Sequence, residues 1–284
     1  MGRIQTSWHI AKRSWAVLRS DKSLAWFPVF SFLGSAAVVA VVAGLIGLAG
    51  IDDSANGHAL QPLGYVFIVF GYLGLALVQT YFLAALVAGA DARLRGGDST
   101  VRGALDVASS RLHRLMPWAV VSATVSIVLS MLERYGVVGR LVAALVGLAW
   151  NLVTFLTVPI LVVEDIGIGA AFTRSKDLFK QTWGENVVGQ AGLGVLGFFV
   201  AIPALVLIGT GAALGTVGVV VFGALGIAWL VVAATVMAAL NGIYRTALYR
   251  FATTGEVPVD FRGTDFQGAF RPRRLGRGSG EPTS

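Results

Sequence analysis

The chain has 284 residues, of which 56% are hydrophobic and only 13% are charged, and its mean hydropathy is +0.76. Soluble proteins carry about 25% charged residues, so this composition excludes a water-soluble domain and indicates an integral membrane protein. The absence of cysteine excludes disulfides, zinc–thiolate sites, iron–sulfur clusters and cysteine nucleophiles.

Six apolar stretches approach or exceed the length of about 20 residues that a helix needs to cross a bilayer. No stretch alternates polar and apolar residues over strand length, so the sequence predicts an all-α polytopic bundle rather than a β-barrel. The expected spans are residues 26–50, 63–89, 117–132, 137–163, 187–208 and 214–240. We expect one transmembrane domain over residues 1–254, followed by a disordered basic cytoplasmic tail over residues 255–284.

The 22 Lys and Arg residues are distributed unevenly around these spans. All but Arg134 and Arg140 fall before the first span, after the second, after the fourth or after the sixth. Cytoplasmic segments are enriched in Lys and Arg, so both termini are predicted to be cytoplasmic. Arg outnumbers Lys by 18 to 4, which is typical of a GC-rich bacterial genome, and the expected location is the inner membrane of a bacterial or archaeal cell. The net charge of +7 reflects this placement, and nucleic acid is not an expected partner. A cleavable signal peptide is the competing interpretation, but the first span begins only at Trp26.

Three long cytoplasmic segments share a pattern at offsets 0, 4, 7, 11 and 14, the spacing of one helix face. The residues at these offsets are all apolar in the first two segments, whereas the third has Ser175 and Thr182 at offsets 7 and 14. The sequence therefore predicts amphipathic surface helices over residues 3–20, 99–116 and 167–183, each followed by a two-span hairpin. Basic residues on the other faces, with one tryptophan, are candidate contacts for anionic lipid or a partner protein. They are Lys12, Arg13, Arg111, Arg114, Arg174, Lys180 and Trp183. Helices that pack against the cytoplasmic side of the bundle as structural joints would show the same periodicity as lipid-binding helices. The threefold unit itself has one alternative, which is a coincidence of common helix periodicity.

Neutral polar residues lie within two of the expected spans. Gln79 is in the second span, and Asn151 and Thr154 are in the fourth. Such groups suit either the pathway of a transporter or hydrogen bonds between helices. Ion-coupled transport usually adds intramembrane charge, and no Asp, Glu, Lys or Arg lies deep in any expected span.

Residues that carry chemistry are sparse. The three histidines have no partner at metal-ligand spacing, and the chain has no phosphate-binding glycine motif. The segment Asp91-Ala-Arg93-Leu-Arg95 is slightly similar to motifs of phospholipid head-group transferases, whose further aspartates are missing downstream. We therefore expect no catalytic residue, metal or cofactor.

The junction between the fourth and fifth spans has the most distinctive sequence. After Pro159 it contains Glu164-Asp-Ile-Gly-Ile-Gly-Ala-Ala-Phe-Thr-Arg174-Ser and then Thr182-Trp-Gly. This pattern resembles that of an uncharacterised prokaryotic membrane family, domain of unknown function 6159. The segments Ser7-Trp8, Ser14-Trp15 and Tyr249–Pro258 are similar to it as well, so the resemblance covers most of the chain up to about Phe270. The resemblance implies a polytopic membrane protein and brings no established activity or residue role.

The acidic pair of this junction, Glu164 and Asp165, suits a helix N-terminus, where carboxylates favour the positive end of the helix dipole. The leading functional hypothesis is a non-enzymatic membrane protein whose basic cytoplasmic helices engage anionic lipid or a partner, with a homo-oligomer as one form of partner. The alternative is a transporter or permease for an apolar or amphiphilic solute. A third hypothesis is a membrane-embedded enzyme that uses the loop acids.

Overall fold

The computed structural model describes residues 3–49 and 62–255 and is all-α over those residues. Nine α-helices and one short 3-10 helix make up this part of the chain. In chain order they are α1 (Arg3–Ser20), η1 (Lys22–Ala25), α2 (Trp26–Leu48), α3 (Pro62–Leu94), α4 (Val101–Ser110), α5 (Leu112–Glu133), α6 (Gly136–Thr154), α7 (Thr157–Val163), α8 (Ile168–Ala213) and α9 (Gly215–Thr254). The expected tail lies outside the described residues after its first residue, Gly255.

Six helical segments of the described chain are long and apolar enough to cross a membrane. They are Lys22–Leu48, Leu63–Leu94, Leu112–Glu133, Gly136–Val163, Leu193–Ala213 and Gly215–Thr254. Lengths of 21 to 40 residues correspond to at least ~30 Å of helix at 1.5 Å per residue. The prediction of an all-α chain with six long apolar segments is confirmed, and the protein is a multi-pass membrane protein.

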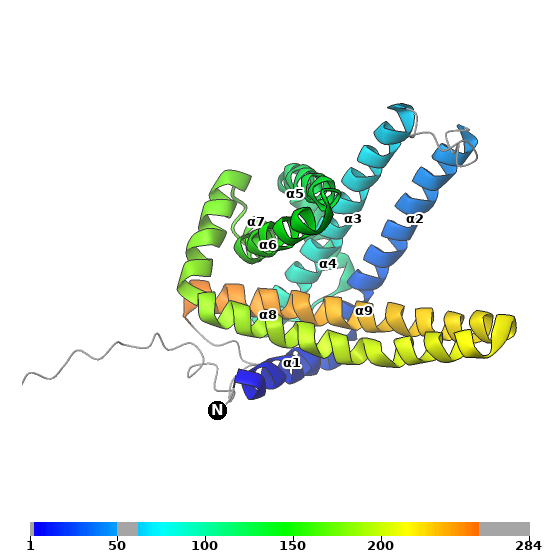
Figure 1. Cartoon of the computed structure of the whole chain (residues 1–284). Helices are drawn as coiled ribbons and strands as arrows, with labels where there is room; N and C mark the ends of the chain where they lie inside the picture. The colour runs from blue at the N-terminus through cyan, green and yellow to red at the C-terminus, as the bar shows by residue number, and fades with distance from the viewer. Residues whose placement is uncertain (1–2, 50–61, 256–284) are drawn as a thin grey trace, which may run out of the picture.

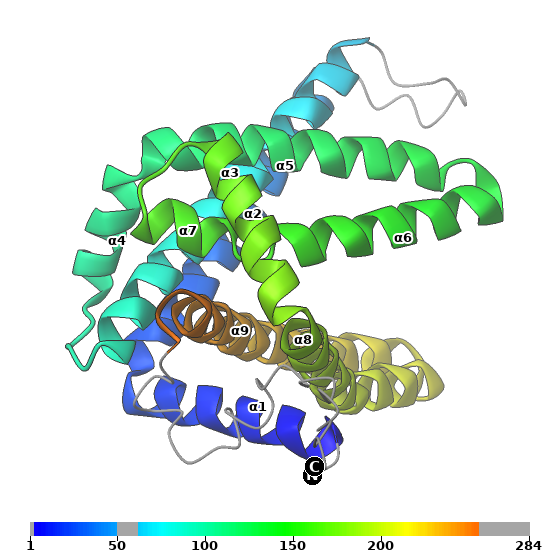
Figure 2. The ribbon, with the colours of Figure 1, turned by 90° about the vertical axis from the view of Figure 1, so that its left-hand side faces the viewer.

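The long helices pair as three hairpins, α2/α3, α5/α6 and α8/α9. The hairpins point in different directions: α2/α3 and α8/α9 diverge in Figure 1, and α5/α6 extends along a third direction in Figure 2. They converge where α4, α7 and the ends of α3 and α9 meet, and α1 lies there against α8 and α9. We call this region the base and the opposite ends of the hairpins the tips.

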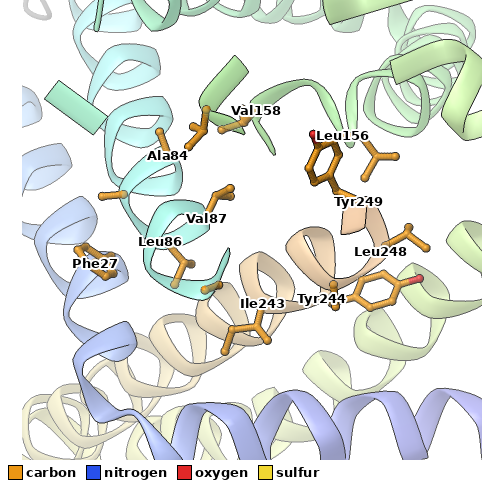
Figure 3. Close-up of a cluster of buried hydrophobic side chains, with 14 of the residues drawn as sticks. Phe27, Ala84, Leu86, Val87, Leu156, Val158, Ile243, Tyr244, Leu248 and Tyr249 are labelled. Atoms are coloured by element: carbon orange, nitrogen blue, oxygen red, sulfur yellow. The ribbon is translucent and has the colours of Figure 1, made fainter. Parts of the chain in front are cut away.

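The hydrophobic core lies in the base. Figure 3 shows part of it, with Phe27 of α2, Leu86 of α3 and Tyr244 of α9 spread across one buried cluster, and each of these residues is at most 2% exposed. Toward the tips, large apolar side chains are turned outward instead, as with Val137 at 82% and Val217 at 76% exposure. Apolar surfaces of this extent are unfavourable in water and match the hydrocarbon of a bilayer.

The fourth expected span is divided into α6 and α7, with a break at Phe155 and Leu156. Proline explains the position of the break, because a proline ring clashes with the carbonyl group four residues earlier. Pro159 is in the first turn of α7, and the residue four positions before it is Phe155. Both residues at the break are buried in the core, so the interruption is part of the base.

The surface helices differ in part from the expectation. Helix α1 spans residues 3–20 as expected, whereas the segment 99–116 is divided at Arg111 between α4 and α5. The third segment, expected as a surface helix over residues 167–183 before a span over 187–208, is instead continuous within α8. Figure 1 shows a sharp bend in α8, so the change of direction takes place without a helix end. Periodicity alone carries no signal that separates a bend from a helix end.

Candidate functional site

Charged side chains from distant parts of the chain meet at the base. Asp91, near the end of α3, is 7% exposed. Its carboxylate accepts a hydrogen bond of 2.7 Å from Nη1 of Arg250 on α9 and forms an ion pair of 2.5 Å with Nη2 of Arg95. The first contact bridges 159 residues of sequence and ties the end of α3 to the end of α9.

Two further carboxylates follow α7. Oε1 of Glu164 accepts a hydrogen bond of 3.0 Å from the Tyr249 hydroxyl on α9 and lies 3.4 Å from Nε of Arg174 on α8. Asp165, with a φ of +51°, forms ion pairs with Arg111 and Arg114, the latter at 3.5 Å. The two acidic residues therefore connect the end of α7 to α5, α8 and α9 at the base.

The expected role of this acidic pair at a helix N-terminus is wrong. Helix α8 begins at Ile168 with Gly167 as its N-cap, and its first turn contains no acidic residue. Glu164 is instead the C-cap residue of α7. Arg111, between α4 and α5, Arg114 of α5 and Arg174 of α8 compensate the two carboxylates instead of the expected helix dipole.

The basal ionic cluster consists of these three carboxylates and five arginines, Arg95, Arg111, Arg114, Arg174 and Arg250. The arginines outnumber the carboxylates, so the cluster carries a net positive charge. Sequence reasoning selected three of its members as basic contacts. It missed the roles of Asp91, Arg95, Tyr249 and Arg250, although the segment Asp91–Arg95 and the tail beginning at Tyr249 were both noticed as motifs.

The other predicted contact residues lie around this cluster. On α1, Lys12 is exposed and Arg13 is half-buried, and on α8 Lys180 is exposed. None of these three forms an ion pair with another described residue. Trp183 belongs to α8, but its side chain lies outside the described part of the structure.

A cleft of about 660 Å³, which we call the basal cleft, opens beside the cluster. Asp91, Arg95 and Arg111 form its charged part. Small and aliphatic residues form the rest of the wall: Ala88, Ala92, Gly96, Gly97, Val107, Val162 and Val163. A charged rim joined to an apolar wall is complementary to an amphiphile with an anionic head group.

The predicted intramembrane polar residues are distributed over two hairpins. Gln79 of α3 lines a groove of about 430 Å³ formed with α2 and α9. Asn151 is exposed on α6, and the Thr154 hydroxyl donates a hydrogen bond of 2.7 Å to the Trp150 carbonyl. Neither Asn151 nor Thr154 lines the groove that contains Gln79. Of the three residues, Thr154 thus has a hydrogen-bond partner on its own helix, and Gln79 lies in a groove.

Comparison with known proteins connects this architecture to a family. A family model described as "Family of unknown function (DUF6159)" matches residues 62–259, from the start of α3 to just beyond α9. The family resemblance stated from the sequence is confirmed over that range. No curated protein and no solved structure matches the chain.

Proposed function

The chain belongs to the DUF6159 family, and we propose that this member binds the head groups of anionic lipids with the arginine-rich base of its three hairpins. The observation that carries the proposal is the basal cleft. Its wall combines aliphatic side chains with the guanidinium groups of Arg95 and Arg111. An anionic phospholipid carries the complementary parts, a phosphate that arginine binds and an apolar chain.

The distribution of charge supports an anionic ligand over a neutral one. Asp91, the acidic residue in the cleft, is compensated by Arg95 and Arg250. The side chain of Arg95 is 56% exposed, so its remaining donors are accessible to a phosphate. Lys12 and Lys180 add exposed positive charge on the neighbouring helices. The field at the base therefore favours an anion.

The proposed orientation places the base at the cytoplasmic leaflet. Arg134 and Arg140 lie at the tip of α5/α6, whereas the basal ionic cluster lies at the opposite end of the hairpins. Lys and Arg are enriched on the cytoplasmic side of membrane proteins, and the cytoplasmic leaflet is rich in anionic lipids. In this orientation the cluster meets anionic head groups directly. The proposal treats the protein as non-enzymatic.

Exchange of Arg95 for glutamine tests the proposal. In nanodiscs that contain equal amounts of phosphatidylglycerol and phosphatidylcholine, the unaltered protein is expected to retain phosphatidylglycerol preferentially, as read by native mass spectrometry. Arg95→Gln is expected to lower that retention about fivefold, because one basic contact near an anionic surface contributes about 1 kcal/mol. High salt is expected to weaken the retention as well, because it screens exposed charges.

The matched control is Arg140→Gln, which removes an exposed arginine from the tip of α5/α6 and is expected to leave retention unchanged. Equal retention of the two lipids by the unaltered protein, or an equal loss in both variants, would contradict the proposal. A stoichiometric protein bound in place of lipid would also contradict it and would favour the partner hypothesis.

A further inference from the structure

The groove that contains Gln79 lies at the fork where the α2/α3 and α8/α9 hairpins separate. Its inner end is closed by Phe27 and Leu86, both buried in the core and labelled in Figure 3. Its outer end is open, because Phe32 and Gln79 are exposed. The volume of about 430 Å³ falls within the range of small-molecule sites. The groove is therefore accessible from the surface that the spans turn toward lipid.

Three polar side chains in this groove have no hydrogen-bond partner among the described residues. They are Ser31 and Ser35 on α2 and Gln79 on α3. Several hydroxyl groups elsewhere on the spans donate to a backbone carbonyl of their own helix, as Ser126 does to Ser122 and Thr124 to Val120. Thr235 of the same groove also does so, to Val231. An unpaired amide or hydroxyl is costly in hydrocarbon, where no water replaces the missing partner. These three groups are thus available to a ligand.

The position of Gln79 restricts the ligand further. Gln79 precedes Asp91 by twelve residues on α3, which corresponds to ~18 Å along the helix. With Asp91 at the membrane surface, the amide lies near the middle of a hydrocarbon layer about 30 Å thick. No ionisable residue lines the groove in the described structure, so a charged ligand would have no counter-ion there.

We infer that this groove binds an uncharged, long-chain lipid-soluble molecule whose hydroxyl or carbonyl group hydrogen-bonds to Gln79, Ser31 and Ser35. Aromatic and aliphatic side chains such as Phe82 and Leu83 contact its chain. The site is separate from the basal cleft, since the two share no lining residue. A phospholipid head group anchored at the interface does not reach this depth, so the ligand differs in class from the anionic lipid proposed for the base.

Photolabelling tests this inference. The protein in phosphatidylcholine nanodiscs is exposed to hexadecanol that carries a mid-chain diazirine, or to hexadecane with the same diazirine. Crosslinked peptides are then mapped by mass spectrometry. The alcohol is expected to label peptides around residues 31–35 and 231–238 about fivefold more than the hydrocarbon does. A fivefold ratio corresponds to about 1 kcal/mol, which is the contribution of a hydrogen bond within a membrane.

Gln79→Leu is expected to reduce labelling by the alcohol to the level of the hydrocarbon. Ser35→Ala is expected to lower it in part, and it provides a milder variant should Gln79→Leu fold poorly. The matched control Asn151→Leu removes an exposed amide from another hairpin and is expected to leave labelling unchanged. Equal labelling by the two probes in the unaltered protein, or full labelling by the alcohol in both groove variants, would overturn the inference. A change in the oligomeric mass of Gln79→Leu would show that a second copy of the chain, rather than a lipid-soluble molecule, occupies the groove, and it would overturn the inference as well.

Discussion

Replacing Asp91 with alanine is expected to lower the free energy of unfolding by about 3 kcal/mol, because breaking a buried ion pair leaves the other charge without compensation. Asp91 is buried, and it holds Arg250 at 2.7 Å and Arg95 at 2.5 Å. The side chain of Arg250 is only 24% exposed, so water compensates for the lost carboxylate poorly. Unfolding by titration with sodium dodecyl sulfate in mixed micelles measures the effect.

The matched control is Asp98→Ala. The carboxylate of Asp98 is fully exposed and lies 3.9 Å from Arg93, so its removal is expected to leave the unfolding midpoint unchanged. Equal losses in both variants would mean that the buried pairs at the end of α3 do not hold the base together.

Gly242→Ala is expected to lower the free energy of unfolding by about 1 to 3 kcal/mol, the usual cost of forcing extra atoms into a well-packed core. Gly242 lies where α9 crosses α3, and a methyl group added there would overlap the side chain of Leu86. Leu86 is 2% exposed and belongs to the core, so it has little space into which to move. The added methyl group is therefore expected to push α3 away from α9. Thermal melting of the purified protein reports the loss.

The control for this substitution lies on the same helix. A methyl group added at Gly223 would meet no atom within 4 Å, so Gly223→Ala is expected to leave the melting temperature unchanged or to raise it slightly. Equal melting temperatures for the two variants would contradict the close contact of α3 and α9 that positions the base.

Sequence reasoning identified the long helices well because a membrane span is a local signal. A run of apolar residues of sufficient length is visible without knowledge of the fold. Breaks within a run were harder to locate. The fourth span was expected as one helix over residues 137–163, although Pro159 disfavours an uninterrupted helix there. The position of the break at Phe155 and Leu156 depends on the core that buries them. The continuity of α8 was missed because a bent helix keeps the same periodicity as two separate ones.

The basal ionic cluster could be predicted only in part, since its contacts are long-range. Arg111, Arg114 and Arg174 were selected for their position on amphipathic segments, and that pattern contains no information about partners. The ion pair between Arg111 and Asp165 connects residues 54 positions apart in sequence. For the same reason Gln79 and Asn151 looked equivalent as polar residues within spans, although only Gln79 lies in a groove with α2 and α9.

Binding of anionic lipid at the base requires that the base face the cytoplasm, so the orientation of the base is the first property to measure. The chain contains no cysteine, so single cysteines can be introduced without background. Asp98→Cys places a thiol in the exposed loop at the base, and Tyr135→Cys places one in the exposed turn at the tip of α5/α6. In intact cells a membrane-impermeant maleimide is expected to label Tyr135→Cys and to label Asp98→Cys only after permeabilisation. Labelling of Asp98→Cys from outside intact cells would place the arginine-rich base on the wrong side of the membrane and contradict the account.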